Sequence, residues 1–339
     1  MDLFIGKWFH KIQQGQRIQC DLCPRLCKIK DGQRGFCFVR KNINNKMILT
    51  TYGRSSGFCV DPIEKKPLNH FYPGSKILSF GTAGCNLGCK FCQNWDISKS
   101  RETDKLANLA SPEDIAQTAK ELGCIGVAFT YNDPVIFAEY AIDIAHYCHK
   151  LGLKTVAVTA GYIMPKPRTE FFAVMDAVNV DLKAFTKTFY KKICYAELAP
   201  VLETLKYLKT ETNIWFEITN LIIPNTNDSE TEITQLIYWI KEELGTDIPL
   251  HFTAFHPDYK MNDLPATPIS TLKKARNIAL NAGLHYVYTG NIINKIGDST
   301  YCPHCDYLLI QRNWHKIVQY NLKNNTCPKC NTKIPGEYS

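Results

Sequence analysis

The sequence has no long hydrophobic stretch of the kind that anchors a protein in a membrane. No apolar run approaches the roughly 20 residues that a transmembrane helix needs. The chain also does not open with a charged segment followed by an apolar one, as a secretory signal peptide does. We therefore expect a soluble, cytoplasmic protein with no membrane partner.

Long blocks of basic residues are also missing, although 40 lysines and arginines against 32 acids give a formal net charge of +8. The basic residues are dispersed, and few aromatic residues alternate with them. Proteins that bind single-stranded nucleic acid combine a positive groove with stacking aromatic side chains. The sequence therefore disfavours nucleic acid as a partner, and the charge is better explained as solvated surface.

Cysteine, in contrast, is abundant, with 15 in a chain of 339 residues. Disulfide scaffolds are typical of much shorter secreted modules, whereas eleven of these cysteines lie in three groups with metal-ligand spacing. Reduced thiols that bind metals are the better explanation. The other four are interpreted as small buried hydrophobic residues without a role. They are Cys59, Cys124, Cys148 and Cys194.

The central group follows an apolar run and has the spacing CxxxCxxC, with Cys85, Cys89 and Cys92 as its ligands. Soft thiolates select iron–sulfur clusters or zinc. Three thiolates leave one iron of a four-iron cluster open to a small-molecule ligand, which indicates chemistry at the metal. The alternative is a structural zinc loop.

The other two groups lie near the ends of the chain. Two CPxC knuckles separated by 21 residues have the spacing of a zinc ribbon, although a rubredoxin-like iron site uses the same ligands. Four further cysteines near the amino end predict a second metal site, for zinc or an auxiliary iron–sulfur cluster. The predicted ligands are Cys302, Cys305, Cys327 and Cys330 in the knuckles, and Cys20, Cys23, Cys27 and Cys37 near the amino end.

Between these groups, short runs with high β propensity alternate with longer amphipathic stretches, a pattern typical of repeated βα units with a parallel sheet. One helix should begin at Ser111 as N-cap, followed by Pro112, and end at Gly123. The predicted strands are 77–82, 126–131, 155–160, 177–182, 214–223, 250–255 and 285–289.

Polar residues follow nearly all of these strands at the point where each strand ends. Parallel barrels build their sites from the loops at the carboxyl ends of the strands, so we expect these residues to line one active site. Asp181 and Lys183, two residues apart, should point to the same side. The set comprises Cys85, Cys89, Cys92, Asn132, Asp133, Thr159, Gly161, Asp181, Lys183, His256 and Asn291.

These motifs resemble the radical S-adenosylmethionine superfamily, and most closely the AmmeMemoRadiSam-system radical enzymes, a group similar to pyruvate formate-lyase activating enzymes. The resemblance extends almost from end to end. Beside CxxxCxxC it rests on CDLCPR at 20–25, DPIEKKPL at 61–68, HFYPG at 70–74, YNDP at 131–134, NVDLK at 179–183 and FHP at 255–257.

The resemblance implies an α/β fold, a partial (β/α)6 TIM-type barrel over 76–297, with a cysteine-rich segment over 1–75 and a zinc-ribbon-like module over 298–339. It implies a 4Fe-4S cluster that reductively cleaves S-adenosylmethionine to a 5′-deoxyadenosyl radical, which abstracts hydrogen from a substrate. The implied partners are a reductase or a flavodoxin- or ferredoxin-type electron donor, and Memo-like and AMMECR1-like proteins.

Several site residues take roles from the same resemblance. S-adenosylmethionine would contact Asn132, Asp133, Thr159, Gly161, Asp181 and Lys183. Substrate handling or proton movement would use Lys183, Glu217 and His256. Simpler roles remain open: a helix cap for Asp133, a salt bridge for Asp181 with Lys183, and a structural role for His256.

Two alternative functions follow. The first is an activase of a glycyl radical enzyme, although the cysteine group over 20–37 precedes the CxxxCxxC loop instead of following it. The second is a metalloprotein without enzymatic activity that binds nucleic acid or senses redox state. The sequence does not identify the substrate, the electron donor or the oligomeric state.

Overall fold

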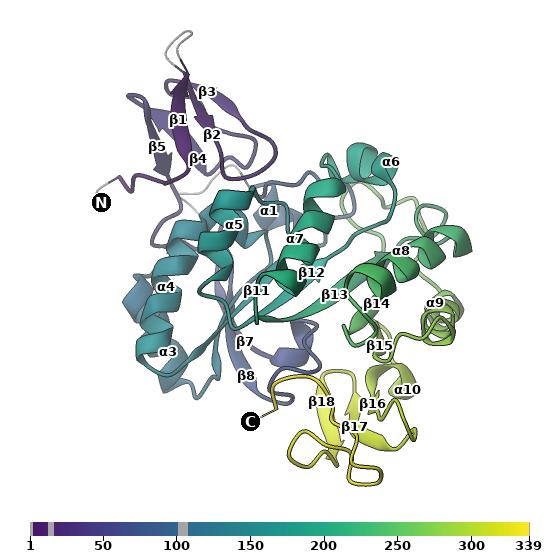
Figure 1. Cartoon of the computed structure of the whole chain (residues 1–339). Helices are drawn as coiled ribbons and strands as arrows, with labels where there is room; N and C mark the ends of the chain where they lie inside the picture. The colour runs from purple at the N-terminus through teal and green to yellow at the C-terminus, as the bar shows by residue number, and fades with distance from the viewer. Residues whose placement is uncertain (1–2, 13–16, 101–107, 339) are drawn as a thin grey trace. The chain divides into compact units, whose positions relative to one another are not determined.

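The structure, a computed structural model, describes residues 3–12, 17–100 and 108–338 (Figure 1). It divides into two compact units. Unit 1 comprises Met1–Asp61, Lys76–Asp176 and Ile193–Thr204; unit 2 comprises Pro62–Ser75, Ala177–Lys192 and Leu205–Ser339. The predicted domain boundaries at 75/76 and 297/298 stay a prediction.

Unit 1 contains three parallel strands, β8 (Lys76–Phe80), β10 (Gly126–Phe129) and β11 (Lys154–Thr159), in the order β8-β10-β11. They confirm the first three predicted strands. Strand β7 (Phe58–Pro62), which the sequence analysis missed, lies beside β8. All of β10 is buried, as continuous apolar runs in parallel sheets are.

Three helices of unit 1, α3 (Pro112–Glu121), α4 (Ala138–Lys150) and α5 (Pro165–Phe172), lie side by side (Figure 1). Helix α3 begins as predicted, because Ser111 and Asp114 form a reciprocal capping box. It ends before Gly123, whose φ of +64° is the left-handed conformation that favours glycine after a helix.

The amino-terminal part of unit 1 consists of short antiparallel strands. Strands β1, β2 and β3 form one sheet, and β4 and β5 form a hairpin. The hairpin turns at Asn44 and Asn45, both with positive φ, as a tight two-residue turn requires. The bounds are β1 (Phe9–Ile12), β2 (Arg17–Cys20), β3 (Lys28–Lys30), β4 (Arg40–Ile43) and β5 (Lys46–Leu49). The smaller elements are β6 (Arg54–Ser55), α1 (Trp95–Ser98), β9 (Asn108–Leu109) and η2 (Pro134–Phe137).

Unit 2 contributes four parallel strands in the order β12-β13-β14-β15, which confirm the last four predicted strands. They are β12 (Ala177–Asp181), β13 (Trp215–Ile222), β14 (Leu250–Ala254) and β15 (Val287–Gly290). The helices of unit 2 are η1 (Ile63–Lys65), α6 (Lys187–Phe189), α8 (Glu230–Glu243), α9 (Ile269–Asn281) and α10 (Lys295–Asp298). Along the chain, η3 (Tyr190–Cys194) and α7 (Ala199–Thr210) each belong partly to unit 1 and partly to unit 2.

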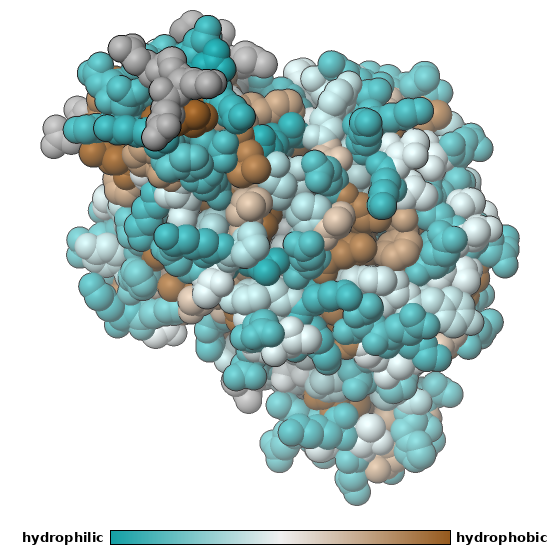
Figure 2. Space-filling model, turned by 45° about the horizontal axis from the view of Figure 1, so that its top comes forward, coloured by the Kyte–Doolittle hydropathy of each residue, from teal (hydrophilic) through white to brown (hydrophobic). Residues whose placement is uncertain are grey.

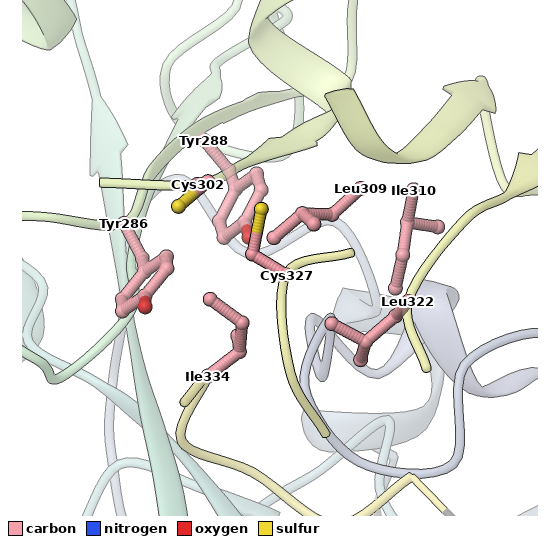
Figure 3. Packing of buried hydrophobic residues seen from close by; sticks show 8 residues of the cluster. All are labelled: Tyr286, Tyr288, Cys302, Leu309, Ile310, Leu322, Cys327 and Ile334. Atoms are coloured by element: carbon pink, nitrogen blue, oxygen red, sulfur yellow. The ribbon is translucent and has the colours of Figure 1, made fainter. Parts of the chain in front are cut away.

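The carboxyl-terminal part of unit 2 is a small antiparallel sheet of β16 (Thr300–Tyr301), β17 (Leu308–Asn313) and β18 (Lys316–Tyr320). Its core contains two of the knuckle cysteines, which pack among aliphatic side chains and two tyrosines that flank the start of β15 (Figure 3). The cluster is Tyr286, Tyr288, Cys302, Leu309, Ile310, Leu322, Cys327 and Ile334.

In each unit, parallel strands alternate along the chain with helices, which is the pattern of an α/β fold, and this confirms the predicted fold class. Among the helices of the described residues, none combines the length and the hydrophobicity that crossing a bilayer requires. The face drawn in Figure 2 carries mainly hydrophilic residues, with hydrophobic residues gathered in small areas between them.

Candidate active site

The CxxxCxxC cysteines lie in the loop at the carboxyl end of β8. Cys89 is buried, whereas Cys85 and Cys92 are half-buried. The loop turns at Gly84, whose φ of +84° is a conformation that glycine adopts without strain. A Cβ atom at this position would also collide with the carbonyl oxygen of Cys37, so the loop requires glycine for two reasons.

Hydrogen-bond donors and a cation surround these thiols. The backbone N–H of Leu87 donates to Cys85 Sγ at 3.4 Å, and Cys92 Sγ lies 3.1 Å from Ser98 Oγ. Burial raises the pKa of Cys85 to about 12, while the ammonium of Lys99 opposes this rise. Lys99 also donates to the carbonyl oxygen of Leu87 at 2.8 Å. The positive charge and the N–H donor stabilise sulfur in its thiolate form.

This donor set fits a thiolate-bound iron–sulfur cluster. Metal binding displaces the thiol protons, so a high pKa in the metal-free protein is no obstacle to it. Cys85, Cys89 and Cys92 would hold the cluster through three soft sulfur ligands, as expected from the sequence.

Asn132 ties the loop after β10 to the cysteine loop. Its side-chain amide donates to the carbonyl oxygen of Gly84 at 2.8 Å and to Thr82 Oγ1 at 3.2 Å. Its side-chain oxygen accepts from the N–H of Thr82 at 3.1 Å. Asn132 therefore fixes the chain directly before Cys85, and its predicted contact with a cofactor stays a prediction.

Asp133 joins the loops after β10 and β11. Its buried carboxylate accepts from the N–H of Val135 at 3.0 Å, from Thr159 Oγ1 at 2.9 Å and from the N–H of Ala160 at 3.0 Å. The first bond makes it the N-cap of η2, the simpler role considered for it. Its negative charge also acts on Cys85, which places the carboxylate close to the cysteine loop.

The segment after β11 is held from two further sides. Gly161 adopts a φ of +65°, and its N–H donates to Thr159 Oγ1 at 3.1 Å. Thr204 Oγ1 donates to the carbonyl oxygen of Gly161 at 2.8 Å, and the side-chain amide of Asn86 donates to that of Tyr162 at 3.0 Å. The structure thus brings the polar residues after β8, β10 and β11 together, as the sequence predicted.

In unit 2, Lys183 Nζ lies 2.9 Å from Asp181 Oδ2 at the carboxyl end of β12. The two side chains do point to the same side, and their contact is the salt bridge that the sequence left open. His256 is exposed and lies after β14. The cofactor and catalytic roles of these three residues stay predictions.

Glu217 lies in the first half of β13, not in the loop at its carboxyl end. The carboxylate is fully buried and accepts from His251 Nε2 at 2.6 Å and from the N–H groups of His70 at 2.7 Å and Asn69 at 3.0 Å. The indole N–H of Trp215 also donates to it at 3.1 Å. This geometry supports a structural role, and the predicted catalytic role of Glu217 stays a prediction.

His70 belongs to the same buried network, and each of its ring nitrogens lies beside a tyrosine hydroxyl. Its Nε2 lies 2.6 Å from the Tyr288 hydroxyl, and its Nδ1 lies 2.7 Å from the Tyr338 hydroxyl. Burial lowers the pKa of His70 from 6.5 to about 4, although Glu217 opposes this shift. The native state therefore binds this proton less readily than the unfolded state does.

We expect unit 2 to lose stability as the pH falls from about 6.5 towards 4, because the unfolded state then takes up a proton that native His70 resists. The loss from this group is on the order of 3 kcal/mol. Urea unfolding of the parent and of His70→Asn at several pH values measures it. For each protein, the free energy of unfolding is plotted against pH. The difference between the two slopes isolates the contribution of His70, since acid-labile metal sites are common to both proteins. Equal slopes would contradict the prediction.

The amino-terminal cysteines lie close enough to one another for their charges to interact. Cys20, Cys23 and Cys37 are buried, and Cys27 is half-buried. Burial raises the pKa of Cys20 to about 12, while the buried guanidinium of Arg40 opposes this rise. A cation beside these thiols suits a site in which they carry negative charge.

The carboxyl-terminal cysteines are gathered more tightly. In the described part of the chain they form the one group of potential ligands whose donor atoms all lie within 4.8 Å of one another. Cys302 and Cys327 are fully buried. The sulfurs of Cys302 and Cys330 are 3.5 Å apart, and those of Cys305 and Cys327 are 3.7 Å apart. Four thiolates at such distances fit one tetrahedral metal ion.

Sequence reasoning missed the contacts among Arg25, Asn86 and Tyr195 that hold the cysteine loop in place. Arg25 donates from its guanidinium to the carbonyl oxygens of Asn86 and Tyr195. Arg25 belongs to the CDLCPR motif and Asn86 lies within CxxxCxxC. The sequence therefore indicates each motif but not the contact between them. No signal in the sequence marks Tyr195. Cys59, interpreted as buried, is exposed in β7.

Comparisons with known proteins agree with this geometry. The sequence profile described as the Radical SAM superfamily matches residues 80–237. The chain is 42% identical to the uncharacterized protein MJ0808 of Methanocaldococcus jannaschii, over 96% of this chain and 97% of that protein. It is 26% identical to the pyruvate formate-lyase-activating enzyme of Clostridium pasteurianum, over 60% of this chain and 89% of that enzyme.

Two solved structures share the fold. SuiB of Streptococcus suis superposes with a TM-score of 0.50 at 15% identity, over 68% of this chain and 52% of that one. A radical SAM methyltransferase from Sphaerobacter thermophilus gives a TM-score of 0.50 at 15% identity, over 66% of this chain and 68% of the other. With its cysteine loop at the carboxyl end of β8 and loops that converge on it, the chain belongs to the radical SAM superfamily and is a radical SAM enzyme.

Proposed function

We propose that this enzyme belongs to the AmmeMemoRadiSam-system group and abstracts hydrogen from a substrate. The observation that carries the proposal is the convergence of the loops after β10 and β11 on the CxxxCxxC loop. Asn132 fixes the entry to the cysteine loop. Asp133, the next residue, joins the loop after β10 to Thr159 and Ala160 after β11. Such cross-linking holds reacting groups in a fixed geometry, which is what positions a substrate for reaction.

The chain's own residues divide the work of the site. Cys85, Cys89 and Cys92 hold the cluster, which when bound supplies the electron that cleaves S-adenosylmethionine. Lys99 offsets the negative charge of the thiolates. The carboxylate of Asp133, close to Cys85, suits the amino group of S-adenosylmethionine. Asp181 and Lys183 at the end of β12 form a salt bridge within unit 2, and their contact with the cofactor stays a prediction.

Further metals and partners complete the proposal. The carboxyl-terminal thiols bind zinc, because a closed tetrahedral set of four thiolates is typical of structural zinc sites. The amino-terminal thiols bind zinc or an auxiliary iron–sulfur cluster. A reductase or a flavodoxin- or ferredoxin-type protein supplies the electron, and Memo-like and AMMECR1-like proteins act with the enzyme.

The test is anaerobic incubation of the reduced, cluster-reconstituted protein with S-adenosylmethionine, followed by chromatography for 5′-deoxyadenosine. We expect product above the level of a sample without reductant. A protein with a full complement of iron that forms no product, with or without the proposed partner proteins, would contradict the proposal.

A second candidate function is activation of a glycyl radical enzyme. It is favoured by the match to a pyruvate formate-lyase-activating enzyme over 89% of that enzyme's length. The amino-terminal cysteines, which precede the CxxxCxxC loop, argue against a simple analogy. Electron paramagnetic resonance of a co-expressed glycyl radical polypeptide decides: a glycyl radical signal supports activation, and a small-molecule product made without such a polypeptide excludes it.

A further inference from the structure

The amino-terminal cysteine segment contacts the loop that would hold the radical cluster. Within unit 1, the guanidinium of Arg25 donates from Nε to the carbonyl oxygen of Asn86, inside CxxxCxxC, and from a terminal nitrogen to that of Tyr195. Both acceptors are backbone atoms, so the contact fixes the course of the chain instead of one side chain.

The same arginine is held between two of the amino-terminal thiols. Its backbone N–H donates to the thiol of Cys23. Its guanidinium lies 3.4 Å from the centre of the Phe36 ring, and the N–H of Phe36 donates to Cys27 Sγ at 3.5 Å. The position of Arg25 is thus set by the residues that surround Cys23 and Cys27.

Tyr195 belongs to a strap that runs along the other side of the cysteine loop. The N–H of Gly88 donates to the carbonyl oxygen of Cys194 at 2.8 Å, and the N–H of Lys90 donates to that of Ile193 at 3.0 Å. A Cβ atom on Gly88 would lie only 2.9 Å from the nearest atom of the Tyr195 side chain, so the two segments pack closely. Arg25 therefore joins the cysteine loop and its strap at one point.

A second contact runs in parallel with the arginine. The carbonyl oxygen of Cys37 fills the place of a side chain at Gly84, directly before Cys85. A change in the turn at Cys37 would therefore move the entry to the cysteine loop. Two amino-terminal segments thus touch the cysteine loop, one directly before Cys85 at Gly84 and one directly after it at Asn86.

We propose that Arg25 is a positioning residue that couples metal binding at Cys20, Cys23, Cys27 and Cys37 to the conformation of the CxxxCxxC loop. This inference rests on the proposed metal site at the amino-terminal thiols. A bound metal fixes Cys23 and Cys27, and these fix Arg25 and Phe36. The planar guanidinium then holds two carbonyl oxygens at once, which a lysine ammonium in its place would not do.

The test compares Arg25→Ala with the parent and with Lys30→Ala, a matched variant that removes an exposed positive charge from β3. The readouts are metal bound per chain, the electron paramagnetic resonance spectrum of the reduced cluster with and without S-adenosylmethionine, and the rate of 5′-deoxyadenosine formation. We expect Arg25→Ala to keep its amino-terminal metal but to change the spectrum and slow the reaction about 10-fold to 100-fold. Lys30→Ala should match the parent.

A double-mutant cycle tests the coupling itself. Cys27→Ser weakens the amino-terminal metal site, and we expect it to change the cluster spectrum as Arg25→Ala does. The double variant should then add nothing to either single change, because both act through one contact. Additive changes would overturn the inference. Should Arg25→Ala fail to fold, Arg25→Lys replaces it. Lysine retains the positive charge but cannot donate to both carbonyl oxygens at once, so this variant should show the same changes in spectrum and rate.

The outcomes separate this inference from the proposal beneath it. A parent protein without metal at the amino-terminal thiols overturns both the proposed metal site and the coupling. A parent that binds this metal, together with an Arg25→Ala variant whose cluster spectrum and rate equal the parent's, overturns the coupling alone and leaves the metal site standing.

Discussion

Replacing Cys89 with alanine is expected to abolish the cleavage of S-adenosylmethionine. Cys89 is the buried member of the three CxxxCxxC thiols, at 7% exposure, so solvent has little access to take the place of its sulfur. Two remaining thiolates would not hold a four-iron cluster that normally has three protein ligands. 5′-Deoxyadenosine should fall to the level of protein-free controls, and bound iron and visible absorption should fall by the share of one four-iron cluster.

The matched control is Cys124→Ala, which removes another buried cysteine of unit 1, after α3 and outside the three cysteine groups. This variant should retain its iron and its activity, because the residue contributes only packing. Cleavage that persists in Cys89→Ala at the rate of Cys124→Ala would show that the cluster is held elsewhere in the chain.

The sheet could be predicted from the sequence because its strands are buried on both faces. Residues 126–129, for example, form a short apolar run that is buried throughout. The polar residues that follow such runs, among them Asn132 and Thr159, had to meet at one edge because parallel strands share their direction. The sequence analysis missed strand β7 because its first three residues are exposed and its last residue is a proline, so it lacks the buried apolar run of the other strands.

The role of Glu217 could not be predicted from its type or its neighbours in the sequence. It lies in the first half of the predicted strand 214–223, whereas the other candidates lie at or beyond the carboxyl ends of their strands. The position of Glu217 inside the predicted strand already argued against a place among the site residues at the carboxyl ends of the strands. Its partners His70 and His251 are 147 and 34 residues away, and no spacing rule links them.

The contact between Arg25 and the cysteine loop was beyond sequence reasoning for the same reason. Arg25 and Asn86 are 61 residues apart, and Arg25 and Tyr195 are 170 apart. Both acceptors are main-chain carbonyls, which every residue carries, so nothing in the sequence marks them as partners. Metal-ligand spacing identifies each cysteine group separately but does not say which groups touch.

Replacing Cys327 with serine is expected to lower the stability of the carboxyl-terminal module sharply. Its thiol is one of four that fit a metal ion, and it packs in the hydrophobic cluster with Ile334 and Leu309. Structural zinc in small domains contributes about 10–16 kcal/mol of apparent binding free energy, which is folding free energy where no site exists in the unfolded chain. The variant should bind less metal and unfold at a markedly lower temperature.

The damage should extend beyond the knuckles, because β17 is joined to an earlier part of unit 2. Arg312 in β17 is buried and donates to the carbonyl oxygen of Asn69 at 2.7 Å, next to His70, whose Nδ1 bonds the Tyr338 hydroxyl. Thermal unfolding followed by circular dichroism, with metal analysis, measures the effect. The control is Lys329→Ala, an exposed residue between Cys327 and Cys330 that offers no ligand, and it should behave as the parent. If Cys327→Ser lost its metal but unfolded at the same temperature as Lys329→Ala, the hydrophobic cluster alone would hold the module, and the metal would have no part in its folding.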